Sequence, residues 1–252
     1  MTKTTQKTKT KTTQETQEEF LDNYNPLDYP SVAVTVDTAI FTIRYNAKGE
    51  FIFAILLIKR RDYPYKGYWA LPGGFLNQNE NSDEAALRET FEETGINPGH
   101  IEQLRTYSTP GRDPRMRVVT IAYLTFTPIG TEPVGGDDAS EARFIDVREL
   151  DNLNIAFDHK EIIADAIERC RSKLEYTSLA TDFLPPTFTM SELRQIYEVV
   201  WGYKLNPTAF RRKVLDCEIV SPTSKVHHTK GRPATKYKPK SSNLHPPFLR
   251  LK

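Results

Sequence analysis

Apolar and polar residues alternate with a period of two in several short segments of the first 150 residues. In residues 31–43, Val32, Val34 and Val36 alternate with smaller or polar side chains, which is typical of a half-buried strand. Residues 51–58 form a continuous apolar run, which indicates a central strand covered on both faces. A turn at 46–49 separates these two strands, and further strands are predicted at residues 101–107, 118–127 and 142–146.

A helical period replaces this alternation in residues 74–96, GFLNQNENSDEAALRETFEETGI. Asn81, followed three residues later by Glu84, indicates a capping box at the start of a helix. The helix is predicted from about Ser82 to Thr94, because Gly95 tolerates the left-handed conformation that ends many helices.

This predicted helix has an acidic face and a less polar one. At about 100° per residue, Glu89, Glu92 and Glu93 fall on one face. The opposite face, which we expect to be buried, is formed by Leu87, Thr90, Phe91 and Thr94. Three adjacent carboxylates repel one another unless a hard cation neutralises them, and oxygen ligands favour Mg²⁺ or Mn²⁺. We therefore predict Glu89, Glu92 and Glu93 as metal ligands and catalytic groups, whereas three glutamates alone would also fit a solvated acidic face.

The spacing of these residues resembles the Nudix box, G-x5-E-x7-R-E-U-x-E-E-x-G-U, where U is bulky and apolar. Gly74, Glu80 and Arg88 stand in register with the three glutamates, and Thr90 at the first U position is the one departure. The resemblance implies the α/β Nudix sandwich, a mixed sheet between helices. It also implies pyrophosphate chemistry, in which metal ions bridge substrate oxygens and activate water.

Basic and glycine residues near the box are candidate ligand contacts. Lys59, Arg60 and Arg61 follow the apolar run, where a phosphate-bearing ligand could meet the end of a strand. The charged turn PGRDPR at 110–115 could read a ligand, and a purely structural turn fits its spacing equally well. The predicted ligand-binding residues are Arg60, Arg61, Gly73, Gly74, Arg112, Asp113 and Arg115.

A second module follows a helix that opens at Asp158 and carries the apolar stripe Ile162, Ile163, Ala166, Ile167 and Cys170. Such a stripe is more often core than partner surface, although a connecting or dimer helix also fits. Thr189 with Glu192 starts one helix, and Asn206 with Pro207 caps the next, at 207–216. A short strand near 218–220, a basic loop at 224–233 and a strand at 234–238 complete the layout of a winged helix.

Charge divides the chain in two. From residue 204 to the end, 12 basic residues face two acidic ones, a net charge of +10, whereas the remainder has 22 basic and 31 acidic residues, a net charge of −9. Such a basic module is expected to bind DNA, with its second helix in the major groove. The predicted contacts are Arg211, Arg212 and Lys213 on that helix and Lys225, Lys230 and Arg232 on the wing. A solvated helix face is the alternative for the first three.

The predicted organisation is a disordered Thr/Lys/Gln-rich tail at 1–25, a Nudix domain at 26–155, a connecting helix at 156–175, a winged helix at 176–240 and a basic tail at 241–252. Cys170 and Cys217 give no disulfide framework and no metal spacing, which favours reduced thiols in a cytoplasmic protein. We find no signal-peptide pattern and no apolar run long enough to span a bilayer.

The order of these parts, with PGRDPR, AFDHKEI, KLEYT, FRRKVL and KGRPATKY, resembles the Nudix-related transcriptional regulators of NAD metabolism. The resemblance implies a homodimer on a palindromic operator that represses genes of NAD synthesis or salvage and binds ADP-ribose in the Nudix pocket. Because the box keeps its glutamates, a metal-dependent ADP-ribose pyrophosphatase is the alternative, with Glu141 as a further candidate base from a later loop. Both functions can hold together.

Overall fold

The computed structural model describes residues 16–134, 139–227 and 234–240. Its internal contacts divide the chain into two compact units, Met1–Val32 and Ala33–Lys252. Within the described residues, no helix is both long and apolar enough to cross a membrane.

The first unit contains a helix where the sequence predicts only a disordered tail. Helix α1 (Gln17–Asn23) is followed by the short 3-10 helix η1 (Pro26–Asp28). A capping box, in which Thr16 and Glu19 exchange hydrogen bonds, fixes the first turn of α1. The disorder prediction is wrong for these residues because the Thr/Lys/Gln composition hides this local signal. Residues 1–15 and the predicted basic tail at 241–252 lie outside the described residues.

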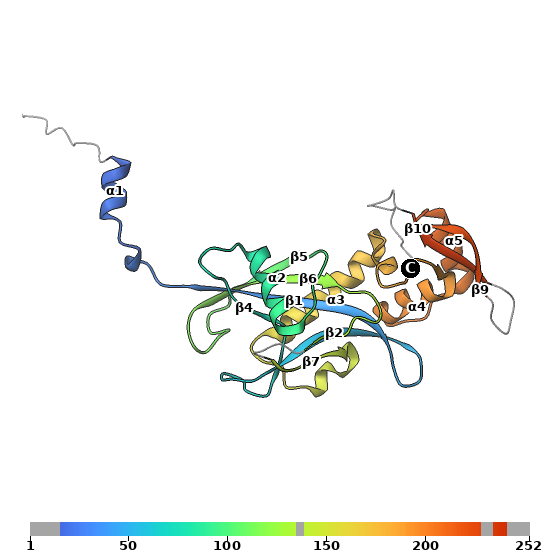
Figure 1. Cartoon of the computed structure of the whole chain (residues 1–252), viewed down its shortest axis with the longest axis horizontal. Coiled ribbons are helices and arrows are strands. Elements are labelled where there is room, and N and C mark those ends of the chain that lie inside the picture. Colours follow the sequence, from blue (N-terminus) through green and yellow to red (C-terminus); the bar gives the residue numbers. More distant parts are fainter. Residues whose placement is uncertain (1–15, 135–138, 228–233, 241–252) are drawn as a thin grey trace, which may run out of the picture. The chain divides into compact units, whose positions relative to one another are not determined.

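A mixed seven-stranded sheet organises the first half of the second unit (Figure 1). The strands are β1 (Ala33–Tyr45), β2 (Phe51–Arg60), β3 (Trp69–Ala70), β4 (Gly73–Phe75), β5 (Glu102–Tyr107), β6 (Val118–Phe126) and β7 (Ala139–Asp146). The main path runs β3-β2-β1-β6-β5, while β4 pairs with β1 and β7 pairs with β2. Strands β1 and β6 are parallel and the other pairs are antiparallel.

Helices cover both faces of this sheet. Helix α2 (Ser82–Thr94) packs Ala85 and Ala86 against Val36 of β1, and helix α3 (His159–Tyr176) packs against Phe41 and Ile43 of the same strand. Because side chains alternate along a strand, even-numbered and odd-numbered residues of β1 serve different helices. The predicted α/β sandwich is confirmed. The 3-10 helix η2 (Val147–Asn152) leads from β7 towards α3.

The buried face of α2 differs from the one predicted. Ala85, Ala86, Thr90 and Thr94 are buried, whereas Leu87 is 37% exposed and Phe91 is 57% exposed. The small side chains let α2 lie close to the sheet, so the face towards β1 and β4 includes the alanines and, beside them, Glu89 and Glu93. The prediction is confirmed for Thr90 and Thr94 and wrong for Leu87 and Phe91, because it placed the bulkiest apolar residues inwards. The capping box of Asn81 and the left-handed Gly95 at the end of the helix agree with the prediction.

The winged helix occupies the rest of the chain. It comprises η3 (Leu179–Thr181), β8 (Phe188–Thr189), α4 (Met190–Trp201), α5 (Pro207–Asp216), β9 (Val220–His227) and β10 (Ala234–Pro239), with strand order β8-β10-β9. Thr189 and Asn206 cap the two helices as predicted. Strand β8 is too short to be seen in the sequence. Strand β9 continues to His227, so the predicted basic loop begins later than residue 224.

Helix α3 joins the two halves through its apolar stripe. Ile162, Ile163, Ala166, Cys170 and Leu174 are buried in one core that also contains Leu193, Ile196 and Phe183. The stripe is therefore core, and Ile167 lies at its half-buried edge. Cys170 and Cys217 are both buried and unpaired.

Candidate functional site

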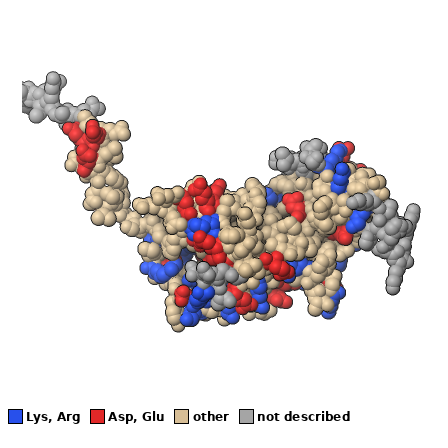
Figure 2. All heavy atoms as spheres, in the orientation of Figure 1, with Lys and Arg blue, Asp and Glu red and all other residues tan. Residues whose placement is uncertain are grey.

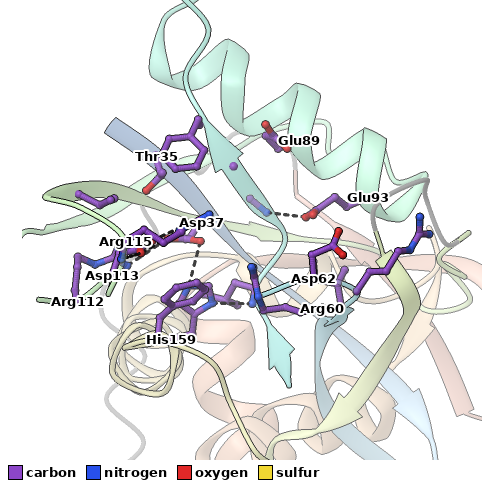
Figure 3. A pocket seen from close by; sticks show the side chains of 18 of the residues that line it. Thr35, Asp37, Arg60, Asp62, Glu89, Glu93, Arg112, Asp113, Arg115 and His159 are labelled. Carbon is purple, nitrogen blue, oxygen red and sulfur yellow. Dashed lines mark hydrogen bonds and ion pairs between the residues drawn. The ribbon is translucent and has the colours of Figure 1, made fainter. Parts of the chain in front are cut away.

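A cavity of about 460 Å³ opens where the ends of β1 and β2 meet α2 and the start of α3 (Figure 3). Strand β1 contributes Thr35 and Asp37, and the end of β2 contributes Arg60 and Arg61. The remaining polar lining comes from Asp62, Tyr63, Gly73, Gly74, Asn77, Glu89, Glu93, Arg112, Asp113, Arg115 and His159. The cavity thus collects all seven predicted ligand contacts and two of the three box glutamates.

Gly73 and Gly74 allow the backbone to pass unusually close to β1 and α2. A Cβ atom on Gly73 would lie 2.1 Å from the carbonyl oxygen of Val36, and one on Gly74 would lie 2.3 Å from Oε1 of Glu89. Gly73 faces backbone and leaves no space for a side chain, whereas a side chain at Gly74 would displace the carboxylate of Glu89. The close approach lets the N–H of Gly73 donate a hydrogen bond of 2.8 Å to Oε2 of Glu93.

Glu93 and Glu89 lie in an environment that disfavours their charge. Burial raises the pKa of Glu93, the neighbouring Glu89 and Asp37 also raise it, and the Gly73 N–H and Arg60 lower it, with a net pKa of about 8. Burial also raises the pKa of Glu89, against the hydrogen bond from Arg88. These carboxylates are therefore short of positive charge.

Arg88 holds the other acidic groups of the box together. Its guanidinium donates to both carboxylate oxygens of Glu80, at 2.9 and 2.6 Å, to Glu89 at 2.7 Å and to Glu92 at 2.9 Å. Acidic side chains gather over α2 in Figure 2. The side chain of Glu92 is 55% exposed and does not line the cavity. The predicted cluster of three carboxylates is thus divided, with Glu89 and Glu93 inside and Glu92 outside.

This division bears on metal binding. Among the described residues, no three His, Cys, Asp or Glu side chains are grouped so that they could hold a metal ion. Glu89 and Glu93 nevertheless present hard oxygen donors at a place where burial disfavours two uncompensated negative charges. Arg88 donates to both Glu89 and Glu92, so Glu93 is the one of the three box glutamates that it does not bind in the described structure.

Two arginines of the predicted ligand turn are used differently. Arg112 is buried, with 4% of its side chain exposed, and its Nε and Nη2 donate to Asp158 at 2.8 and 2.6 Å. Asp158 therefore binds Arg112 rather than capping α3 through its side chain. Arg115 is 43% exposed, is held by Asp113 at 2.7 Å and lies over the ring of Phe75 at 5.4 Å. Arg112 is thus paired inside the protein and Arg115 is the more exposed of the two arginines, while ligand contacts of Arg112, Asp113 and Arg115 stay predictions.

His159 was absent from the predicted site. Its Nδ1 accepts a hydrogen bond of 3.0 Å from the N–H of Leu71, so the proton of the neutral ring sits on Nε2. Nε2 lies 3.4 Å from Asp37, which also accepts a hydrogen bond from Thr120. Burial lowers the pKa of His159, which favours this neutral form. The sequence carried one signal, the segment AFDHKEI, but no spacing linked it to the box.

Glu141 is not a loop residue. It lies in β7, opposite Lys59 of β2, and its carboxylate is 3.9 Å from Lys59 and 3.7 Å from Arg143. The predicted loop position is wrong because the strand begins earlier than residue 142. The role of Glu141 as a base stays a prediction.

On the winged helix, the three predicted basic residues of α5 differ in exposure. Arg211 and Arg212 are exposed and Lys213 is half-buried. The guanidinium of Arg211 lies 5.6 Å from the centre of the Tyr237 ring, at the base of the β9–β10 hairpin. Lys225 lies in β9, with its side chain outside the described part, and Lys230 and Arg232 fall in the undescribed segment 228–233.

Both parts of the chain match known protein families. Residues 36–166 match the NUDIX domain family, and residues 180–238 match the NrtR DNA-binding winged helix domain. The chain belongs to the Nudix family. Within that family it combines a Nudix domain with an NrtR-type winged helix, as the sequence resemblance predicted.

Several relatives share this architecture or its first half. The ADPR responsive transcriptional repressor NtrR of Acinetobacter baylyi is 36% identical over 221 residues, which cover 87% of this chain and 86% of the relative. The ADP-ribose pyrophosphatase of Methanocaldococcus jannaschii is 50% identical over 111 residues, 44% of this chain and 64% of that enzyme.

Solved structures of Shewanella oneidensis NrtR resemble the fold closely. The complex with a 27mer DNA has a TM-score of 0.70 at 31% identity and covers 82% of this chain and 93% of that one. The NUDIX domain of the same protein complexed with ADP ribose has a TM-score of 0.55 at 30% identity, covering 62% of this chain and 99% of that one.

Proposed function

We propose that this chain is a transcriptional repressor of NAD synthesis or salvage genes that senses ADP-ribose in its Nudix cavity. The observation that carries the proposal is the joining, in one chain, of an NrtR-type winged helix and a Nudix cavity lined by both cations and acidic residues. A relative with this architecture over most of its length is named as an ADPR-responsive repressor. The matching Nudix domain of Shewanella oneidensis NrtR was solved with ADP ribose.

The cavity suits a nucleoside diphosphate sugar. Its volume of about 460 Å³ falls in the range of small-molecule sites, about 300 to 1,000 Å³. Arg60, Arg61 and Arg115 offer positive charge to a diphosphate, and Phe75 and Tyr63 add aromatic surface to which a base can stack. Gly73 and Gly74 let the ligand approach the backbone.

A divalent cation, Mg²⁺ or Mn²⁺, would bind at Glu89 and Glu93, with Glu92 joining if it leaves Arg88. When bound, such an ion neutralises the phosphate oxygens of the ligand and lowers the pKa of water. The protein itself contributes the positioning: Gly73 fixes the carboxylate of Glu93, and Arg88 fixes that of Glu89.

The winged helix would bind a palindromic operator as a homodimer, as the sequence resemblance implies, and the similar NrtR of Shewanella oneidensis was solved with a 27mer DNA. Arg211, Arg212 and Lys213 on α5 and Lys225, Lys230 and Arg232 of the hairpin are the proposed DNA contacts. Binding of ADP-ribose would weaken operator binding, which requires that it bind the two arrangements of the dimer with different affinity. A gene regulator acts in the cytoplasm of a bacterial or archaeal cell, and this is the location we propose.

A second function, ADP-ribose pyrophosphatase activity, is favoured by the complete box of Glu80, Arg88, Glu89, Glu92 and Glu93. The 50% identity to an enzyme of this name supports it over 111 residues. Water would attack one phosphorus, and the products would be AMP and ribose 5-phosphate. The bond between Arg88 and Glu92 weighs against efficient turnover, because it withdraws one carboxylate from the cavity.

One titration separates the two functions. Fluorescence anisotropy on the DNA upstream of the protein's own gene is recorded with and without ADP-ribose and Mg²⁺, and AMP is measured in the same samples. Specific binding relieved by ADP-ribose, with little AMP, supports the sensor. Rapid AMP release with salt-sensitive binding that does not depend on sequence supports the enzyme and contradicts the repressor.

A further inference from the structure

Helix α3 begins at the wall of the ligand cavity and ends against the winged helix. Its first residue, His159, lines the cavity, and its last turns contact α4. The 18 residues include neither glycine nor proline, so the helix spans roughly 27 Å as one rigid element at about 1.5 Å per residue. A displacement at one end therefore reaches the other.

The near end is held by an ion pair between the buried Arg112 and the partly buried Asp158. Asp158 receives both guanidinium hydrogen bonds of Arg112, and Arg112 lines the cavity 3.7 Å from Asp37. The side chain of Asp158 gives the backbone of α3 no cap. An anionic ligand in the cavity attracts the guanidinium of Arg112 and competes with Asp158 for it.

The neighbouring residue ties the same turn to the opposite wall. Nδ1 of His159 accepts the N–H of Leu71, two residues before Gly73. Gly73 in turn donates to Glu93. The first turn of α3 is thus connected to both the arginine and the glutamate sides of the cavity.

Two hydrogen bonds, one in each direction, join the far end of α3 to α4. Nε of Arg171 donates to the carbonyl of Val200 at 3.1 Å, and Nε1 of Trp201 donates to the carbonyl of Arg171 at 3.1 Å. Cys170 and Leu174 of α3 share a buried core with Leu193 and Val200 of α4. Side chains this closely packed move together rather than independently.

We propose that Asp158 is the positioning residue that couples the ligand cavity to the winged helix, through Arg112 at one end of α3 and Arg171 with Trp201 at the other. This inference rests on the proposed ligand-responsive repressor and names how its response is transmitted. Asp158 holds α3 in the DNA-binding position while Arg112 is bound to it. When an anionic diphosphate draws Arg112 into the cavity, the first turn of α3 is released.

The test compares Asp158→Asn with a matched control on the same helix. Asp165→Asn also weakens an ion pair of α3, with Arg105 at 2.8 Å, but lies outside the cavity. For each protein, ADP-ribose affinity is measured by calorimetry, the melting temperature by circular dichroism, and operator Kd with and without saturating ADP-ribose.

We expect wild type and Asp165→Asn to show the same ligand-induced rise in operator Kd, which for allosteric proteins is about five- to 150-fold. In Asp158→Asn the rise should shrink to less than about twofold, a small fraction of that range, while ADP-ribose still binds. A full wild-type rise in a folded Asp158→Asn protein overturns the inference. If wild type itself shows no rise, the proposed function fails instead.

Variants at the far end keep the test decisive if Asp158→Asn does not fold. Trp201→Phe removes one reciprocal hydrogen bond and keeps an aromatic ring, and Arg171→Gln removes the other. Both should lower the ligand-induced rise in operator Kd with unchanged ADP-ribose affinity, because they lie far from the cavity. Unchanged rises in both folded variants would overturn the inference as well.

Discussion

The carboxylate of Glu93 accepts a hydrogen bond of 2.8 Å from the backbone N–H of Gly73, the residue that begins β4. This bond fixes the acidic end of α2 against the strand that leads into the box. The other charged groups near this carboxylate are Glu89 and Asp37, which raise its pKa, and Arg60, which lowers it. The charge of Glu93 is therefore costly to the protein unless a cation is bound.

The stability of the metal-free protein should consequently fall as the pH rises from about 5 to about 8. Burial raises the pKa of Glu93 from its ordinary value of 4.5 to about 8 in the folded protein. Between these values the folded protein holds a proton that the unfolded chain has lost, so the free energy of unfolding decreases with pH, by roughly 2 to 4 kcal/mol in total. Urea unfolding at a series of pH values in EDTA measures this.

Glu93→Gln is the control for that pH series, because its amide does not titrate. The buried His159, whose pKa is lowered, has the opposite effect. Below about pH 6.5 the unfolded chain protonates this histidine more readily than the folded protein does, so the free energy of unfolding decreases as the pH falls. Subtracting the free energy of unfolding of Glu93→Gln from that of wild type at each pH cancels the contribution of His159. Parallel curves for the two proteins would contradict the assignment, and added Mg²⁺ should stabilise wild type more at pH 8 than at pH 5.

Thr90→Val should stabilise the protein by about 1 kcal/mol. Thr90 is fully buried on α2, and its hydroxyl finds no hydrogen-bond partner among the described residues. Valine has the same shape and removes the unpaired polar group. The matched change Thr94→Val should destabilise, because the Thr94 hydroxyl donates to the carbonyl of Thr90 and accepts from the N–H of Ile96. We expect the melting temperature of Thr90→Val to lie above that of wild type and the melting temperature of Thr94→Val to lie below it.

Those features of α2 that depend on local spacing could be predicted from the sequence. The capping box of Asn81 and Glu84, the left-handed Gly95 and the glutamate positions all follow from residues within one or two turns. The cost of a hydroxyl at Thr90 was also predictable, because Thr90 departs from the bulky apolar residue of the box. The winged helix was accessible for the same reason, through its caps and its charge.

The missing parts of the site depend on contacts between distant segments. Asp158 and His159 meet Arg112 and Leu71 across 46 and 88 residues, and no local pattern records such a pairing. Arg88 binds both Glu89 and Glu92, yet only Glu89 lines the cavity, a difference that their helical spacing alone did not predict. Periodicity gives the face of a helix but not the partner that each side chain finds.

Arg115→Ala should lower ADP-ribose affinity by about 10-fold, the loss of one charge-assisted contact of roughly 1.5 kcal/mol. Its side chain is 43% exposed at the cavity beside Phe75, whereas that of Arg112 is 4% exposed and paired with Asp158. Arg112→Ala should in addition destabilise the fold by about 3 kcal/mol or more, because it leaves the buried Asp37 and the partly buried Asp158 without their arginine. Calorimetry and urea unfolding on both variants test this division. Equal losses of affinity without loss of stability would contradict it.

Arg212→Ala and Arg211→Ala should affect operator binding in different ways. Both residues are exposed on α5, but the guanidinium of Arg211 lies over Tyr237 beside the hairpin, where a phosphate contact is expected. Loss of a phosphate contact lowers affinity for all sequences and reduces the slope of log Kd against log salt by about 1. Arg212 is free of such a ring contact in the described structure, so we expect it to reach base edges, and Arg212→Ala should cost roughly 1 to 3 kcal/mol on the operator alone.

Anisotropy titrations on operator and scrambled DNA at several salt concentrations separate the two effects. Lys160→Ala is a suitable control, because Lys160 is an exposed residue of α3 paired with Asp151 rather than part of the winged helix. Its binding curves should match those of wild type at every salt concentration. If Arg212→Ala weakens operator and scrambled DNA equally, α5 binds only the DNA backbone, and the sequence must be read by the hairpin.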